Sequence, residues 1–182
     1  MSYFSMFPLV YYDAKASGTN KVYTNLMHRL KMISNTKESL MNFDYYDVQD
    51  GDTPEIISFK YYGDVQYHWT ILYVNDITDY YSQWPMTVQK FEEFVNDKYD
   101  NPLDTHHYEI TQTSGENTKI IDVGLGIKTE DGLNSDYPSA TDISNYQYEE
   151  SLEEQKRQIR LIQPKYIEQF VKEFERKLNE SV

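Results

Sequence analysis

The segment from residue 46 to residue 75 constrains the fold of this 182-residue chain more than any other. Tyr46 and Val48 alternate with polar residues, as in a strand with one buried face. An Asp-Gly pair then supplies a sharp turn, because glycine adopts a positive φ without steric cost. The helix that follows stops at Gly63, a typical C-terminal helix residue. This order of strand, turn, helix, glycine and second helix predicts a small α+β centre.

The start of the first helix allows two phasings. Thr53 can cap it, with Pro54 at the first helical position, where a missing N–H loses no hydrogen bond. Alternatively, Asp52 is the cap and Glu55 reaches back to it, as in a capping box. The apolar residues that this helix can bury are Ile56, Ile57, Phe59 and Tyr61.

Asp64 is expected to cap a second helix, on which Val65, Trp69 and Leu72 share one face. Trp69 lies on that apolar face, so we expect it to pack in the core rather than to bind sugar. After Asn75, the chain continues through a Tyr-Tyr step and a Trp-Pro step to Thr87. Thr87 is the expected cap of a third helix, whose apolar residues are Phe91, Phe94 and Val95.

Further elements are expected on both sides of this centre. A helical spacing of apolar residues predicts a short amphipathic helix near the N-terminus, at Val22, Leu26, Leu30 and Ile33. Residues 107–123 predict a β-hairpin, and residues 124–141 predict an exposed loop. Residues 149–157 are strongly charged, and Glu153 with Arg157 is suited to an i,i+4 pair.

A strand is expected at residues 159–162, and Pro164 opens a last helix. The apolar positions of that helix are Ile167, Phe170, Val171, Phe174 and Leu178. The expected fold is therefore α+β, with a strand–helix–helix centre, a third helix, a β-hairpin and a C-terminal strand–helix extension. We expect three parts: an N-terminal arm and helix (1–42), a central domain (43–99), and a C-terminal hairpin, acidic loop and strand–helix extension (100–182).

Composition excludes several classes of function. The net charge is −13, and the sequence-independent part of nucleic-acid binding needs cations to replace counterions. The charge is uneven, because residues 47–148 carry −14 while residues 1–46 carry +2 and residues 149–182 carry −1. No apolar run approaches the roughly 20 residues of a membrane span. The absence of cysteine excludes disulfides and thiolate chemistry.

Candidate catalytic residues are few. Asp104, His106, His107 and Glu109 form the one cluster with metal-ligand chemistry. In a regular strand, His106 and His107 point to opposite faces and cannot share a metal ion. The paired glutamates, such as Glu149-Glu150, diverge around a helix and suit a solvated surface. We therefore expect no catalytic residue, no metal and no cofactor. A small enzyme that uses the histidine region remains an alternative to the two binding functions considered below.

Two groups of residues are candidates for binding a partner protein. Tyrosine is abundant in this chain, and it is enriched in protein interfaces and sugar sites alike. Tyr80, Tyr81 and Trp84 are hypothetical subunit contacts of this aromatic kind. Lys156, Arg157 and Arg160 form a basic strip that either contacts a neighbouring subunit or pairs with the preceding glutamates.

The central segment resembles a LysM module, which usually binds wall sugars. The residues that carry this resemblance run from Gly51-Asp52-Thr53-Pro54-Glu55 to Trp69-Thr70-Ile71-Leu72-Tyr73. Sugar-binding members typically close with a second strand ending in an Ile-x-x-Gly-x-x-Leu-x-Ile-Pro-like sequence. Here Asn75-Asp76-Ile77 leads into a third helix instead. This departure favours assembly as the function, and a LysM-type peptidoglycan- or chitin-binding module is the alternative.

Almost the whole chain resembles the LysM-containing baseplate wedge protein of T-even-like contractile-tailed bacteriophages. The matching features are the N-terminal Phe7-Pro8-Leu9-Val10-Tyr11-Tyr12, the basic segment around 26–32, the central module, and the run from Asn145-Tyr146-Gln147-Tyr148 to the last helix. The resemblance implies a structural virion protein without catalysis. It would join neighbouring wedges around the central hub.

The resemblance also implies partners and a location. The partners would be the wedge core subunits, the small wedge subunit that initiates the sheath, and neighbouring wedges, with six copies in each baseplate and no nucleic acid or membrane. The protein would assemble in the host cytoplasm and end in the virion, at the tail baseplate.

Overall fold

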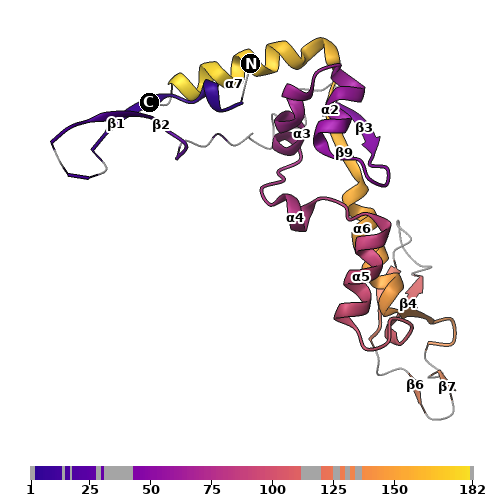
Figure 1. Ribbon diagram of the computed structural model, residues 1–182. Coiled ribbons are helices and arrows are strands. Elements are labelled where there is room, and N and C mark those ends of the chain that lie inside the picture. The colour runs from indigo at the N-terminus through magenta and orange to yellow at the C-terminus, as the bar shows by residue number, and fades with distance from the viewer. Residues whose placement is uncertain are drawn as a thin grey trace. The chain divides into compact units, whose positions relative to one another are not determined.

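The computed structural model describes residues 3–13, 15–16, 18–27, 30, 43–111, 120–124, 128–129, 132–133 and 137–180. The chain divides into two compact units (Figure 1). Unit 1 comprises Met1–Trp84 and Gln158–Val182, and unit 2 comprises Pro85–Arg157. Unit 2 is therefore an insertion within the sequence of unit 1. Among the described residues, no helix has both the length and the apolar character needed to cross a membrane.

Both units mix helices with short strands, which confirms the α+β class. Unit 1 contains η1 (Tyr3–Met6), β1 (Leu9–Tyr12), β2 (Lys21–Thr24), β3 (Phe43–Asp47), α2 (Pro54–Tyr62), η2 (Val65–Tyr67), α3 (His68–Val74), α4 (Tyr80–Gln83), β9 (Gln158–Ile162) and α7 (Pro164–Glu180). Unit 2 contains α5 (Val88–Lys98), β4 (Thr105–Thr111), β5 (Ile120–Asp122), β6 (Lys128–Thr129), β7 (Gly132–Leu133), β8 (Thr141–Ser144) and α6 (Asn145–Arg157).

Local signals set the ends of the central helices. Thr53 is the N-cap of α2, and its side chain accepts a hydrogen bond from the Ile56 N–H. The phasing that makes Asp52 the cap is wrong, because the Asp52 carboxylate instead accepts hydrogen bonds from Tyr46, Lys60 and the Gln49 N–H. Gly63 ends α2 at φ 78°, as expected. Asp64 then caps η2, which runs directly into α3.

A strand from the far end of the chain completes the central sheet. β9 pairs antiparallel with β3, placing Phe43 opposite Ile162 and Asp47 opposite Gln158. The side chain of Asn75, at the end of α3, hydrogen-bonds to both the N–H and the carbonyl oxygen of Arg160 at 2.9 Å. The order β3, α2, α3, β9 therefore forms a two-stranded sheet with two helices, and its last strand follows the whole of unit 2 in the sequence.

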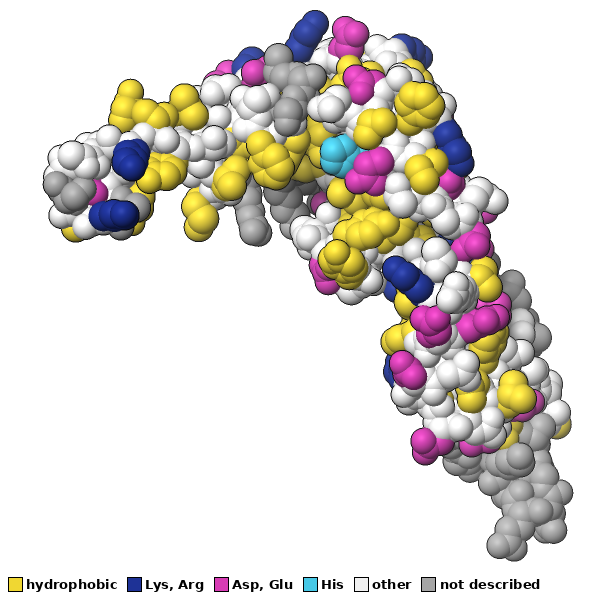
Figure 2. Space-filling view, in the orientation of Figure 1, with side chains coloured by type: hydrophobic (Ala, Val, Ile, Leu, Met, Phe, Trp, Pro, Cys, Tyr) yellow, Lys and Arg dark blue, Asp and Glu magenta, His cyan; other side chains and the backbone are white. Residues whose placement is uncertain are grey.

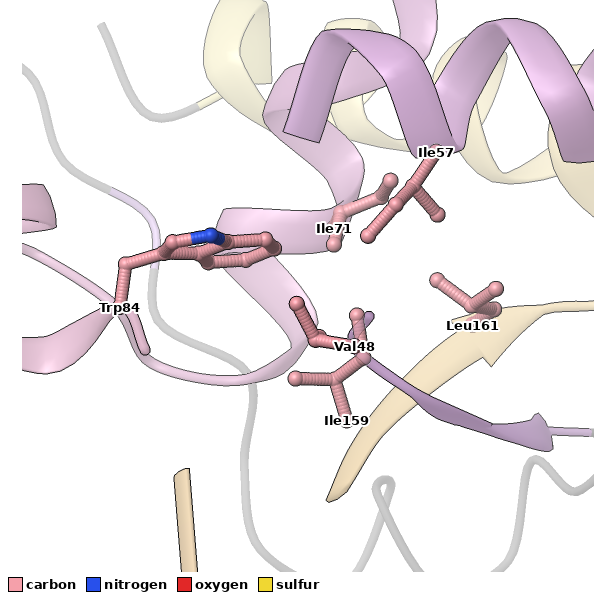
Figure 3. Packing of buried hydrophobic residues seen from close by; sticks show 6 residues of the cluster. All are labelled: Val48, Ile57, Ile71, Trp84, Ile159 and Leu161. Atoms are coloured by element: carbon pink, nitrogen blue, oxygen red, sulfur yellow. The ribbon is translucent and has the colours of Figure 1, made fainter. Parts of the chain in front are cut away.

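The core of unit 1 lies between this sheet and its helices. Figure 3 shows six of its buried side chains, contributed by every part of the central segment and by β9: Val48, Ile57, Ile71, Trp84, Ile159 and Leu161. A second cluster packs Met6 and Phe7 against Trp69, Phe174 and Leu178. Trp69 is only 6% exposed, which confirms its expected place in the core. In the same cluster, the N-terminal segment packs against α7.

Removing unit 2 gives a first prediction. Trp84 and Ile159 pack in one cluster, so a short Gly-Ser linker can join Trp84 to Gln158 in place of residues 85–157. Each halving of a loop changes its closure free energy by only about 0.6 kcal/mol. We therefore expect unit 1 to unfold cooperatively in urea, followed by circular dichroism, within about 2 kcal/mol of its stability in the full chain. A non-cooperative transition would contradict the expectation that unit 1 folds without unit 2.

The expected N-terminal helix is wrong at its start. Residues 21–24 form β2, which pairs antiparallel with β1: Val10 lies opposite Tyr23 and Tyr11 opposite Val22. β-Branched and aromatic side chains favour such cross-strand pairs, and this pairing outweighs the helical spacing. Leu30 packs on the second cluster, while Ile33 lies outside the described residues.

Unit 2 contains a three-stranded sheet, α5 and α6. β4 is the central strand, with β5 and β8 on either side. The β4–β5 pairing confirms the predicted hairpin strands, whose connection lies outside the described residues. Thr87 caps α5 as expected, with Phe91 and Val95 buried. The segment expected to be loop includes the short antiparallel pair β6–β7 and leads into β8. Backbone pairing there needs no apolar periodicity.

The last helix matches its expectation more closely. α7 begins at Pro164, and Ile167, Phe174 and Leu178 are buried. Phe170 and Val171 are partly buried against the second cluster. The strand before it is also confirmed, because β9 covers residues 158–162.

Candidate interaction surface

α2 carries apolar side chains on both of its faces. Ile57 and Ser58 are fully buried against the core. On the outer side, Ile56 and Phe59 are three residues apart and therefore neighbours on the helix surface; Phe59 is 62% exposed. A helix of a soluble domain usually places polar residues on its outer face, so this one is suited to contact with another protein. Figure 2 shows hydrophobic side chains on the exposed surface of the molecule.

The three aromatic residues predicted as subunit contacts lie together at α4. The Tyr80 ring stacks on Trp84 with centroids 5.7 Å apart, and Tyr81 meets Tyr80 edge-on at 5.9 Å. Their exposure differs sharply, because Tyr81 is 89% exposed whereas Trp84 is 4% exposed. The indole Nε1 of Trp84 donates to the carbonyl oxygen of Asp52 at 3.0 Å. Trp84 is therefore a support beneath Tyr80, and the tyrosines are the side chains that a partner can reach.

α4 lies close to the first turn of α2. Burial raises the pKa of Tyr80, and the negative charge of Glu55 raises it further. Glu55, in the first turn of α2, is therefore near Tyr80. We call the group Ile56, Phe59, Tyr80 and Tyr81 the α2–α4 surface.

The predicted basic strip is engaged within each unit. In α6, Lys156 forms an ion pair with Glu153, and Arg157 pairs with Glu154 at 3.2 Å. These i,i+3 pairs replace the expected pair of Glu153 with Arg157, since Glu153 also accepts the Met86 N–H at 2.9 Å. In unit 1, Arg160 donates to the Val74 carbonyl oxygen at 3.2 Å and lies over the Phe43 ring. Pairing with preceding glutamates, the alternative reading of the strip, therefore applies to Lys156 and Arg157.

The two adjacent histidines do not diverge as a regular strand requires. The pairing of β4 with β8 shifts between Thr105 and His107, so that His106 is an extra residue in a β-bulge. The two Nδ1 atoms lie 2.9 Å apart, and His107 Nε2 lies 3.0 Å from Glu109 Oε1. His106 stacks on Tyr148, with ring centroids 4.0 Å apart. Within the described part of the chain, no three His, Cys, Asp or Glu side chains are grouped to hold a metal ion.

Glu149 is a buried carboxylate that links α6 to the end of α5. Its Oε1 accepts hydrogen bonds from Lys98 Nζ and from the Tyr99 hydroxyl, both at 2.7 Å. Burial alone raises the pKa of Glu149, but these two hydrogen bonds outweigh it and hold that pKa below its ordinary value. The charged glutamate therefore stabilises unit 2, in contrast to the solvated surface expected for both members of the Glu149-Glu150 pair.

The neighbouring pair Glu149 and Glu150 allows a matched test. Glu149→Gln should lower the free energy of unfolding by about 1–2 kcal/mol, because an amide accepts less strongly than a buried carboxylate. Glu150 is exposed, so Glu150→Gln should change it by less than about 0.5 kcal/mol. Urea denaturation at neutral pH measures both variants. Equal effects would remove the special role of Glu149.

The β1–β2 hairpin is a candidate contact that the sequence did not indicate. Every residue of both strands is exposed, and Figure 2 shows hydrophobic side chains along it. Residues 9–12 are all apolar or aromatic, so both faces of the strand are apolar and no amphipathic pattern marks them. The N-terminal half of the chain thus offers two exposed apolar surfaces, the α2–α4 surface and this hairpin.

Comparison with known proteins identifies the family of the chain. Residues 2–122 match the family described as Base plate wedge protein 53, and a search of curated proteins found no match. The chain belongs to this family of phage baseplate wedge proteins, as its resemblance to such a family predicted. It is accordingly a structural component of the tail baseplate, present in the virion and assembled with other baseplate components.

Proposed function

We propose that this chain joins neighbouring wedges around the hub during baseplate assembly in the host cytoplasm. The observation that carries the proposal is the α2–α4 surface on a chain of the wedge family. Exposed tyrosine and phenylalanine side chains are typical anchors of protein interfaces. The expected partners are the wedge core subunits and the small subunit that initiates the sheath, with six copies of this chain in each baseplate. The role is architectural and requires no catalysis.

Tyr80 and Tyr81 provide the test of this contact. Replacing both with alanine should weaken the association of co-expressed wedges about tenfold or more, as for central interface anchors. The free energy of unfolding of the isolated chain should change by less than about 1 kcal/mol, because Tyr81 is 89% exposed and Tyr80 is 37% exposed. Tyr45→Ala is the matched control, since Tyr45 is 71% exposed on β3. Sedimentation of wedges mixed with each variant measures the association. Equal sedimentation of wild-type and double-variant mixtures would sink the anchor role.

A second candidate function is peptidoglycan or chitin binding. The observation that favours it is β9, which supplies the second strand that a LysM-like centre needs. Against it, both tryptophans are buried, and the Asn75 side chain is already bonded to β9. Pelleting of the chain with insoluble peptidoglycan distinguishes the two functions. Retention that falls when exposed tyrosines are replaced would support the sugar site over wedge joining.

A further inference from the structure

The β1–β2 hairpin has two apolar faces, and neither is buried. Residues directly opposite each other in an antiparallel pair share a face. The register therefore places Leu9, Tyr11 and Val22 on one face, with Thr24. The other face carries Val10, Tyr12 and Tyr23, with Lys21. We call these the first face and the second face of the hairpin.

A strand pair that meets water on one side normally shows apolar residues on one face and polar residues on the other. Apolar residues on both faces are the pattern of strands that are covered on both sides. All the residues of β1 and β2 are nevertheless exposed. A two-stranded hairpin on its own is also only marginally stable in water. Both observations indicate that the hairpin is completed by contacts on each face.

The residues that precede β1 anchor the hairpin to unit 1. Met6 and Phe7, which precede β1, are buried in the second cluster with Trp69 and Phe174. The Asn25 N–H donates to the Pro8 carbonyl oxygen at 2.8 Å, directly beyond the last paired residues. The hairpin is therefore attached to the core of unit 1 through Met6 and Phe7.

Asp13 follows β1 and binds two backbone N–H groups beyond it. Its carboxylate accepts hydrogen bonds from the Lys15 N–H at 3.2 Å and the Gly18 N–H at 2.6 Å. Residues 9–24 contain two lysines and one aspartate, so this segment is basic in an acidic chain. Lys15 and Lys21 are exposed. Charge complementarity thus favours a partner whose apolar surface has an acidic rim.

We propose that strands β1 and β2 form a bridge between wedges, in which the apolar, acidic-rimmed surface of one wedge covers the first face and that of the neighbouring wedge covers the second. This rests on the proposed function and specifies how one chain contacts two wedges at once. Contact through one face alone leaves the other apolar face in water. Contact with both wedges buries both faces of the hairpin.

Two matched variants separate the faces. The first-face variant carries Leu9→Thr, Tyr11→Thr and Val22→Thr. The second-face variant carries Val10→Thr, Tyr12→Thr and Tyr23→Thr. Threonine retains a high strand propensity, so each variant keeps the hairpin while removing one apolar face. Leu103→Thr is the control, because Leu103 is 79% exposed in unit 2.

The probe is the wedge complex of the same phage, assembled without this chain and mixed with each variant before sedimentation. We expect each face variant to co-sediment with single wedges but to need about tenfold more wedge, or more, to join them. The control should join wedges as the wild type does. The unfolding midpoint of each isolated variant should match that of the wild type.

Several results would overturn the bridge. Normal joining by both face variants would exclude it while leaving wedge joining intact, whereas failure of the wild type to join wedges would defeat the proposed function itself. A defect in only one variant would mean docking through one face. A lowered unfolding midpoint would mean that the chain covers the face itself. Self-association of the wild type that the face variants lose would assign the hairpin to contact between two copies.

Discussion

Replacing Trp84 with alanine should lower the free energy of unfolding of unit 1 by about 3–5 kcal/mol, the usual cost of truncating a buried tryptophan. The indole packs with Val48, Ile57 and Ile159 in the main core cluster (Figure 3). It also donates a hydrogen bond to the Asp52 carbonyl oxygen, and its loss leaves that buried acceptor unpaired. The variant therefore combines a cavity with a lost hydrogen bond.

Urea denaturation of the full chain, followed by circular dichroism, measures this effect. Trp84→Phe separates the two contributions, because it keeps most of the ring but removes the N–H donor; we expect about 1–3 kcal/mol. Tyr81→Ala is the control and should stay within about 0.5 kcal/mol of the wild type, since the tyrosine side chain is exposed. A Trp84→Ala variant as stable as the wild type would mean that the indole does not support the core.

This prediction changes how wedge association is tested. A Trp84 variant that associates poorly can do so because its unit 1 is unfolded. Tyr80 and Tyr81 remain the informative positions, since both are exposed. Tyr80 stacks on the indole, and Tyr81 contacts Tyr80. A combined Tyr80 and Trp84 variant would mix loss of fold with loss of contact.

The central helices could be predicted from the sequence because their signals are local. Thr53, Pro54, Gly63 and Asp64 set helix ends through contacts with residues only a few positions away. The choice between the two phasings of α2 was not local, however. Asp52 is drawn away from the helix end by Tyr46 on β3 and by Lys60, a full two turns along α2.

The closing strand could be predicted as a strand but not as a partner of β3. The apolar residues of β9 indicate burial, and nothing in them specifies Phe43–Asp47 as the paired strand. The two paired strands are separated in the sequence by the whole of unit 2. The prediction of an N-terminal helix was wrong for a related reason. The conformation of Val22 and Tyr23 is set by pairing with β1, and their helical spacing does not decide it.

For the candidate contacts, the sequence predicted which residues are candidates but not how exposed each one is. Tyr80, Tyr81 and Trp84 do lie together, but their sequence does not distinguish the exposed rings from the buried one. His106 and His107 show the same limit, because one extra residue in β4 brings together rings that a regular strand separates. Alternation rules assume regular pairing, and a bulge breaks that assumption.

Replacing Asp52 with alanine should lower the free energy of unfolding by about 2–4 kcal/mol at neutral pH, because several donors to a buried carboxylate lose their acceptor. Its Oδ2 accepts from the Tyr46 hydroxyl at 2.7 Å and from the Gln49 N–H at 3.2 Å. Its Oδ1 accepts from Lys60 Nζ at 2.7 Å. Lys60 is about half exposed and can be hydrated when Asp52 is absent, so Tyr46 and Gln49 account for most of the loss.

The same network gives a pH dependence with a definite sign. Burial alone raises the pKa of Asp52, but the hydrogen bonds from Lys60, Tyr46 and Gln49 outweigh it and hold that pKa below its ordinary value. Burial, and then the bond to Asp52, raise the pKa of Tyr46 to about 12, so the phenol stays a donor. A lowered carboxyl pKa contributes stability that is present above the unfolded value and is lost as the pH falls through the folded value. The loss should therefore occur below about pH 4.

Comparing wild type with Asp52→Asn isolates this contribution from the other carboxylates. The amide cannot titrate, so the difference in unfolding free energy between the two chains should be largest at neutral pH and should shrink as the pH falls below about 4. Asp47→Asn is the matched control, because Asp47 is exposed on β3 and its carboxylate lies 3.5 Å from Gln49 Nε2. Its difference from wild type should be small throughout. A gap between wild type and Asp52→Asn that is unchanged at low pH would show that the charge of Asp52 does not stabilise the turn between β3 and α2, because the protonated carboxyl would then be as stabilising as the carboxylate.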